Sequence, residues 1–217
     1  MRIIIAGALM TVFTVTGSQA WAEAYLDLYA GPSFTDSSRV EIKSNVAITD
    51  REVSFEHDTT YGLRSGYWFR DKPWIGVGGD VNFMRAKGDK AKFDIFSLTP
   101  MAMFRLPLLT SEEIPQGTLQ PYAGLGPSLG MYTYASADFG PPTNNINGAN
   151  VSLGLQIPAG IALQLSKHVA LFAEYRFAWY KVIEMHHITT FDTNNEANKL
   201  TAALDIHNAL FGISFRF

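Results

Sequence analysis

The segment "VSLGLQIPAGIALQL" (residues 151–165) places an apolar residue at every second position and a small or polar residue between. Successive side chains of a β-strand point to opposite faces, so the alternation predicts a strand with one wholly apolar face. The run is also about twice the length of an ordinary strand. Half-buried strands of soluble sandwiches are usually shorter and carry more charge on their outer face. The segment therefore indicates a strand with one face toward an apolar environment and the other face toward a polar interior.

The same alternation recurs along the chain. The segments that share it are 24–31, 61–70, 74–84, 93–106, 119–134, 169–180 and the closing stretch from about 204 to 217. With 151–165 they make eight strands, an even number. Their connections are tight at 70–73 and 166–168, intermediate at 107–118, and long and polar at 33–58, 135–149 and 182–201, with a short one around 87–90.

Short turns on one rim and long loops on the other are typical of an outer-membrane barrel. A closed barrel satisfies every backbone hydrogen bond between strands, which hydrocarbon surroundings demand. We therefore expect an all-β fold: an eight-stranded antiparallel up-and-down transmembrane β-barrel.

The first residues predict export. Arg2 precedes an apolar stretch that ends near Val15, and Ala20-Trp21-Ala22 fits a small-x-small cleavage site. The stretch is short for a spanning helix. We therefore expect residues 1–22 to be a cleaved signal peptide and residues 23–217 to form the barrel domain.

Composition excludes several functions. Cysteine is absent, which rules out disulfides and thiolate chemistry. The formal net charge of −3, without a basic patch, argues against nucleic-acid binding.

Three segments resemble the small eight-stranded bacterial outer-membrane barrels of the OmpA, OmpX and opacity-protein type: "HNALFGISFRF", "AEYRF" and "PYAGLGPSLG". The resemblance implies location in the cell outer membrane, contact with outer-membrane lipid and lipopolysaccharide, and a monomer. It also implies that the terminal aromatic residues Phe215 and Phe217 belong to the signal read by the barrel-assembly machinery.

Alternation places seven charged side chains inside the barrel. They are Asp27, Arg64, Asp80, Arg105, Glu174, Arg176 and Arg216. Since an unpaired buried charge is costly, these acids and bases should pair. They predict either a salt-bridged interior that fills the barrel or a small porin-like channel lined by charge, and the sequence alone does not separate the two.

The sequence shows only weak signals of catalysis, cofactor binding or metal binding. A lipid A-modifying hydrolase is the third alternative, because some barrels of this family are lipid A deacylases. The deacylase carries a His-x-Ser-Asn signature, which this chain lacks. We therefore expect that the protein is not an enzyme. His57, His186 and His187 fall in expected loops, where histidines are more often solvated than metal-bound. We expect no cofactor and no metal site.

The long loop 33–58 is the best candidate for binding, because loops on a rigid scaffold usually carry it. Its "RVEIKSNVAI" and "REVSF" pieces are strand-forming and predict a hairpin above the membrane. We therefore expect a structural or surface-interaction role, adhesin-like or opacity-like, through an extracellular ligand of these loops.

Two expectations concern the wall. Leu155→Arg should block assembly, whereas Gln156→Arg on the interior face should be better tolerated. Pro100, Pro121, Pro127 and Pro158 fall inside expected strands. Proline cannot donate to the ladder, so we expect bulges or positions outside the membrane at some of them.

Overall fold

The computed structural model describes residues 23–36, 38–43, 48–53, 55–56, 58–88, 91–136, 150–187 and 198–217. The predicted signal peptide and His57 lie outside these ranges. The strands are β1 (Glu23–Thr35), β2 (Ser38–Lys43), β3 (Ile48–Val53), β4 (Phe55–Glu56), β5 (Asp58–Trp68), β6 (Ile75–Gly88), β7 (Ala91–Arg105), β8 (Leu119–Ser136), β9 (Asn150–Ser166), β10 (Val169–His187) and β11 (Asn198–Arg216). In the described ranges, no helix is long and apolar enough to cross a membrane.

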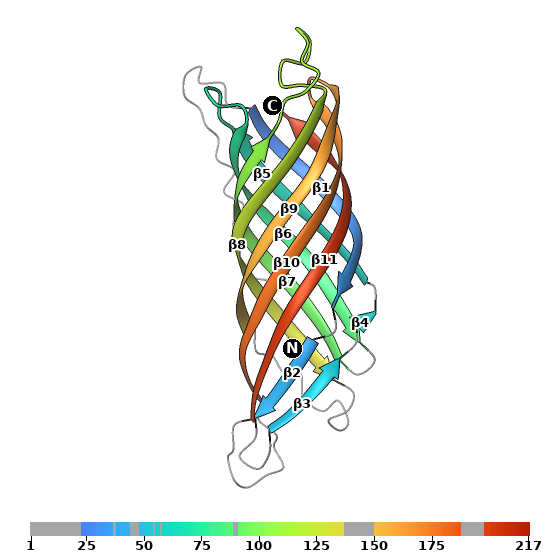
Figure 1. Ribbon diagram of the computed structural model, residues 1–217, viewed down its shortest axis with the longest axis vertical. Coiled ribbons are helices and arrows are strands. Elements are labelled where there is room, and N and C mark those ends of the chain that lie inside the picture. Colours follow the sequence, from blue (N-terminus) through green and yellow to red (C-terminus); the bar gives the residue numbers. More distant parts are fainter. Residues whose placement is uncertain are drawn as a thin grey trace, which may run out of the picture.

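The eight long strands close into a barrel (Figure 1). Each pairs antiparallel with its neighbour in the order β1-β5-β6-β7-β8-β9-β10-β11, and β1 pairs with β11 to complete the ring. At the closure, Leu28 lies opposite Ile213. The eight-stranded up-and-down barrel predicted from the alternation is confirmed.

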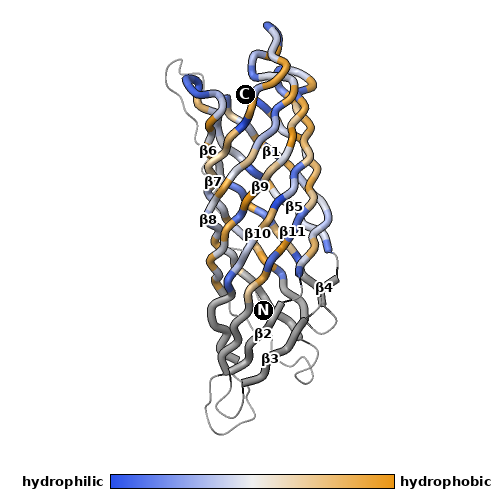
Figure 2. The backbone as a smooth tube through the Cα atoms, in the orientation of Figure 1, coloured by the Kyte–Doolittle hydropathy of each residue, from blue (hydrophilic) through white to orange (hydrophobic). Residues whose placement is uncertain are grey.

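The two faces of the wall differ in polarity, as the alternation predicts. Leu153 and Phe211 on the outer face are 61% and 65% exposed, whereas Gln156 and Arg176 on the inner face are fully buried. Figure 2 shows the result as orange and blue residues alternating along the strands. The wall is therefore apolar outside and polar inside.

The two ends of the barrel differ in the length of their connections. We call the end with the connections 69–74, 106–118 and 167–168 the turn end, where Glu23 and Phe217 also lie. The opposite end, where β1 leads into β2 and where β10 ends and β11 begins, is the loop end.

Strands β10 and β11 are longer at the loop end than expected. The ladder continues after a register shift between Val182 and Met185, and pairs His186 with Lys199 and His187 with Asn198. The expectation that 182–201 is a loop holding both histidines is therefore wrong for much of its length. Outside the membrane a strand needs no apolar face toward lipid, so its length follows from pairing with its neighbour and not from an alternating pattern.

The predicted hairpin in loop 33–58 is present as β2 and β3. It adds to the outer part of β11, with Val40 opposite Ala202 and Lys43 opposite Lys199. The hairpin therefore extends the wall at the loop end (Figure 1).

The prolines sit in the wall without shifting the register. The β7–β8 ladder lacks the pairs between Leu98↔Leu129 and Ala102↔Leu125, where the register sets Pro100 opposite Pro127. The β8–β9 ladder is interrupted similarly where Pro158 faces Gly124. The expected bulges are absent from these two ladders. Pro100 and Pro127 lose their ladder bonds in one shared gap, and Pro158 leaves a second gap opposite Gly124.

Candidate functional site

A cluster of charged side chains crosses the middle of the barrel. Arg176 on β10 bonds to Asp80 on β6 at 3.0 Å, and these strands stand opposite each other in the ring. The Arg176 Nε and Nη2 atoms donate to Glu174 Oε1 at 2.8 and 2.6 Å. All three side chains are fully buried. The contact joins the two sides of the barrel across its lumen.

Arg64 on β5 joins the same cluster from a third direction. Its Nε donates to Asp27 Oδ2 at 2.9 Å, and its Nη1 donates to Glu174 Oε2 at 2.7 Å. The other Asp27 oxygen accepts a short hydrogen bond from Ser214. Glu174 thus bridges both arginines, and the cluster holds three carboxylates against two guanidinium groups.

Tyrosine hydroxyls complete the cluster. Tyr29 donates to Asp80 at 2.9 Å, and Tyr122 donates to Glu174 Oε2 at 2.7 Å. Arg176 also stacks on the Tyr29 ring, 4.5 Å from its centroid. Hydrogen bonds to charged groups are stronger than those between neutral groups, so the cluster is rigid. We call this cluster of Asp27, Arg64, Asp80, Glu174 and Arg176 the plug.

Uncharged polar side chains fill the lumen next to the cluster. Gln156 accepts from Arg176 Nη1 at 3.4 Å and donates to Tyr180 Oη at 2.7 Å and to Ser97 Oγ at 3.1 Å. Ser97 in turn donates to Asn82, and Thr99 to Ser128 at 2.7 Å. The plug therefore continues as a hydrogen-bonded layer with its polar groups satisfied.

A second charged group lies at the turn end. Arg105 donates from Nη2 to Glu23 Oε2 at 2.5 Å and from Nε to the Pro73 carbonyl at 2.7 Å. Its guanidinium also lies 4.4 Å from the Trp68 ring centre. Arg216 Nη1 is 3.5 Å from Glu23 Oε1. Two guanidinium groups thus share one carboxylate here.

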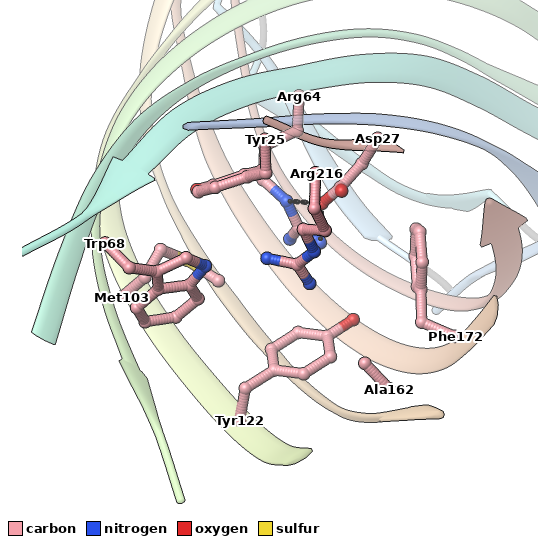
Figure 3. Close-up of a pocket in the computed structure, with 9 residues that line it drawn as sticks. All are labelled: Tyr25, Asp27, Arg64, Trp68, Met103, Tyr122, Ala162, Phe172 and Arg216. Carbon is pink, nitrogen blue, oxygen red and sulfur yellow. Dashed lines mark hydrogen bonds and ion pairs between the residues drawn. The ribbon is translucent and has the colours of Figure 1, made fainter. Parts of the chain in front are cut away.

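A small cavity of about 10 Å³ separates this group from the central cluster. Nine residues line it: Tyr25, Asp27, Arg64, Trp68, Met103, Tyr122, Ala162, Phe172 and Arg216 (Figure 3). Glycines make room for the Tyr25 ring beside it, since a Cβ at Gly66 or Gly78 would lie 2.7 or 2.5 Å from the Tyr25 hydroxyl.

The seven charged residues predicted to face inward are all buried in the interior. Five of them meet in the central cluster, whereas Arg105 and Arg216 lie in the separate group at the turn end. Glu23 and Tyr29 were missed as partners. Alternation from Asp27 along β1 would have placed Tyr29 inside, but only the fold shows which opposite strand each one meets.

The described residues offer little for catalysis or metal binding. No group of three or more His, Cys, Asp and Glu among them is arranged to hold a metal ion. The His168 ring contacts the Arg216 carbonyl, and His207 contacts Tyr175 at 2.6 Å and Asp36 at 3.4 Å on the outer face. Neither ring is paired with a serine hydroxyl, which a serine nucleophile would need.

The sequence match covers nearly the whole chain: a family model described as the outer membrane protein beta-barrel domain matches residues 5–217. The chain belongs to this family. It is an outer-membrane β-barrel protein, and its apolar outer face lies against lipid. In bacterial barrels of this kind the short turns face the periplasm, which places the loop end outside the cell.

Solved structures of the same fold agree. OprG from Pseudomonas aeruginosa is 18% identical with a TM-score of 0.58, over 90% of this chain and 96% of that one. AlkL is 13% identical with a TM-score of 0.54, over 94% and 95%. No curated protein matches the chain.

Proposed function

We propose that this outer-membrane barrel acts at the cell surface, through the wall and loops of its loop end. The observation that carries the proposal is the length of β10 and β11. Each has 19 residues, about eight more than a tilted strand needs to cross a bilayer. The β2–β3 hairpin lies against β11 in this same region. A paired sheet that projects beyond the membrane is a rigid base for surface recognition.

The filled lumen supports this proposal against the channel alternative. Small barrels of about eight strands are filled by their own side chains, and here a buried ion cluster joins opposite walls. A conducting path through this layer would have to part Arg176 from both Asp80 and Glu174. The role we assign to these interior charges is therefore structural.

Two further proposals complete this assignment. The barrel is a monomer, because its eight long strands close on themselves without a free edge in the membrane. Phe217, which is 74% exposed at the turn end, and Phe215 before it form the part of the chain read by the assembly machinery.

The test uses bacteria that display the protein and a variant in which residues 38–53 are replaced by a short Gly-Ser linker. Attachment to a cultured epithelial monolayer should fall to the level of cells without the protein, while the folded amount on unheated gels stays equal. A linker inserted in the turn 112–116 is the matched control and should leave attachment unchanged. Equal attachment by all three strains would refute the surface role.

The channel alternative is tested on the purified barrel in a planar lipid bilayer. We expect no discrete current steps, because the ion cluster blocks the lumen. Ion-selective steps that change with Arg176→Met would replace the surface role with a channel role.

A further inference from the structure

The cavity beside the turn-end charges is lined by buried hydrogen-bond donors without acceptors. The indole Nε1 of Trp68 and the Nε and Nη1 of Arg216 have no hydrogen-bond partner among the described residues. Trp68 is 4% exposed and Arg216 is 6% exposed. Both groups can only donate, and a buried donor left unpaired costs free energy.

The two donors turn into the same space. Figure 3 shows the Trp68 indole nitrogen and the Arg216 guanidinium facing the middle of the cavity from its two sides. The Tyr25 ring holds them in place, because it lies 5.8 Å from the Trp68 ring and 5.3 Å below the Arg216 guanidinium. Their geometry is thus fixed by packing before any ligand arrives.

The charge of the turn-end group also favours an anion. Arg105 and Arg216 share only Glu23, and Arg105 holds it more closely, at 2.5 Å against 3.5 Å for Arg216. Asp27 lines the cavity as well, but its two oxygens are taken by Arg64 and Ser214. Within the turn-end group, one positive charge therefore remains without a close counter-ion. The central cluster on the other side of the cavity carries one carboxylate in excess, but its carboxylates are bonded to their own partners.

We propose that this cavity is a binding site for a small inorganic anion of halide size, held by the Trp68 indole N–H and the Arg216 guanidinium. The volume of about 10 Å³ is that of a site for one small particle, so we choose a monatomic anion. A water molecule fits the space as well, but it must place two hydrogens and only the Tyr25 hydroxyl in the lining is an unpaired acceptor, whereas a halide only accepts. The central cluster fills the lumen on one side of this site. The site therefore lies at the periplasmic end of the barrel and is not a step in a conduction path.

The test uses bromide with the full barrel purified from outer membranes into detergent micelles. Bromide replaces gluconate at constant ionic strength while the indole N–H resonances are followed by NMR. We expect a saturable shift of the Trp68 signal, assigned from Trp68→Phe. The Trp74 signal is the internal control, because Trp74 is 48% exposed on the outside and should not saturate.

Stability gives a second readout, since a ligand that binds only the folded state raises the melting temperature. Bromide should stabilise the unmodified barrel and Trp74→Phe alike. Trp68→Phe, which loses one charge-assisted hydrogen bond, should need about tenfold more bromide for the same effect. Arg216→Gln should abolish the effect.

Several outcomes would overturn the proposal. A Trp68 signal that does not respond to bromide would mean that water fills the cavity. Parallel, non-saturating shifts of Trp68 and Trp74 would mean a general salt effect. If Arg216→Gln does not fold, the titration of the unmodified barrel still decides between these results.

Discussion

Replacing Arg176 by methionine should destabilise the barrel strongly. The side chain is fully buried and donates to Glu174, Asp80, Tyr29 and Gln156 at 2.6–3.4 Å. Methionine fills much of the volume, but among the described residues it leaves Asp80 with only the Tyr29 hydroxyl as a hydrogen-bond partner. Removing one partner of a buried ion pair costs about 3–5 kcal/mol, because the other charge stays buried without compensation.

The assay is equilibrium unfolding in urea of the barrel refolded into lipid vesicles, followed by tryptophan fluorescence. Arg85→Met is the matched control, since Arg85 pairs with Asp94 at 2.6 Å but its side chain is 40% exposed. Solvent screens that pair, so we expect a much smaller loss. The ion-pair lengths are similar, and the two sites differ in burial and in the number of partners that each arginine holds.

A compensating variant sharpens the test. Arg176→Met combined with Asp80→Asn should recover part of the lost stability, because the stranded charge is gone. If Arg176→Met loses no more stability than Arg85→Met, the cluster does not hold the barrel together, and the structural role of the interior charges fails.

Two further substitutions test the wall. Leu155→Arg should cost about 2–4 kcal/mol, because it sets a charge on the lipid-facing side, and the yield of folded barrel on unheated gels measures it. Gly126→Ala should lower folded yield, because its Cβ would lie 2.1 Å from the Pro100 carbonyl oxygen, whereas Gly79→Ala meets nothing within 4 Å and should fold like the parent. Equal yields for the two alanine variants would show that the β7–β8 contact at the prolines is looser than the structure has it.

The structure revises one expectation about the interior. Alternation alone suggests that Gln156→Arg is better tolerated than Leu155→Arg. Gln156 is fully buried, however, bonds to Ser97 and Tyr180, and lies 3.4 Å from Arg176 Nη1. A second guanidinium there would repel Arg176, so Gln156→Arg should also be harmful.

Features that depend on local alternation could be predicted from the sequence. The side-chain period of a strand is two, so the run 151–165 by itself separates outward Leu153 from inward Gln156. Eight such runs with connections of alternating length then imply a closed barrel. The same rule places Asp27, Arg64 and Arg176 inside, without saying what each one meets.

Partners across the lumen were decided only by the tertiary structure. Asp80 meets Arg176 because β6 and β10 stand opposite each other once the ring closes, with the register aligning residues 96 positions apart. Strand ends at the loop end likewise depend on pairing, since β10 and β11 continue to pair beyond the register shift between Val182 and Met185. The unpaired donors of Trp68 and Arg216 also could not be predicted from the sequence, because whether a buried group finds a partner depends on all the strands around it.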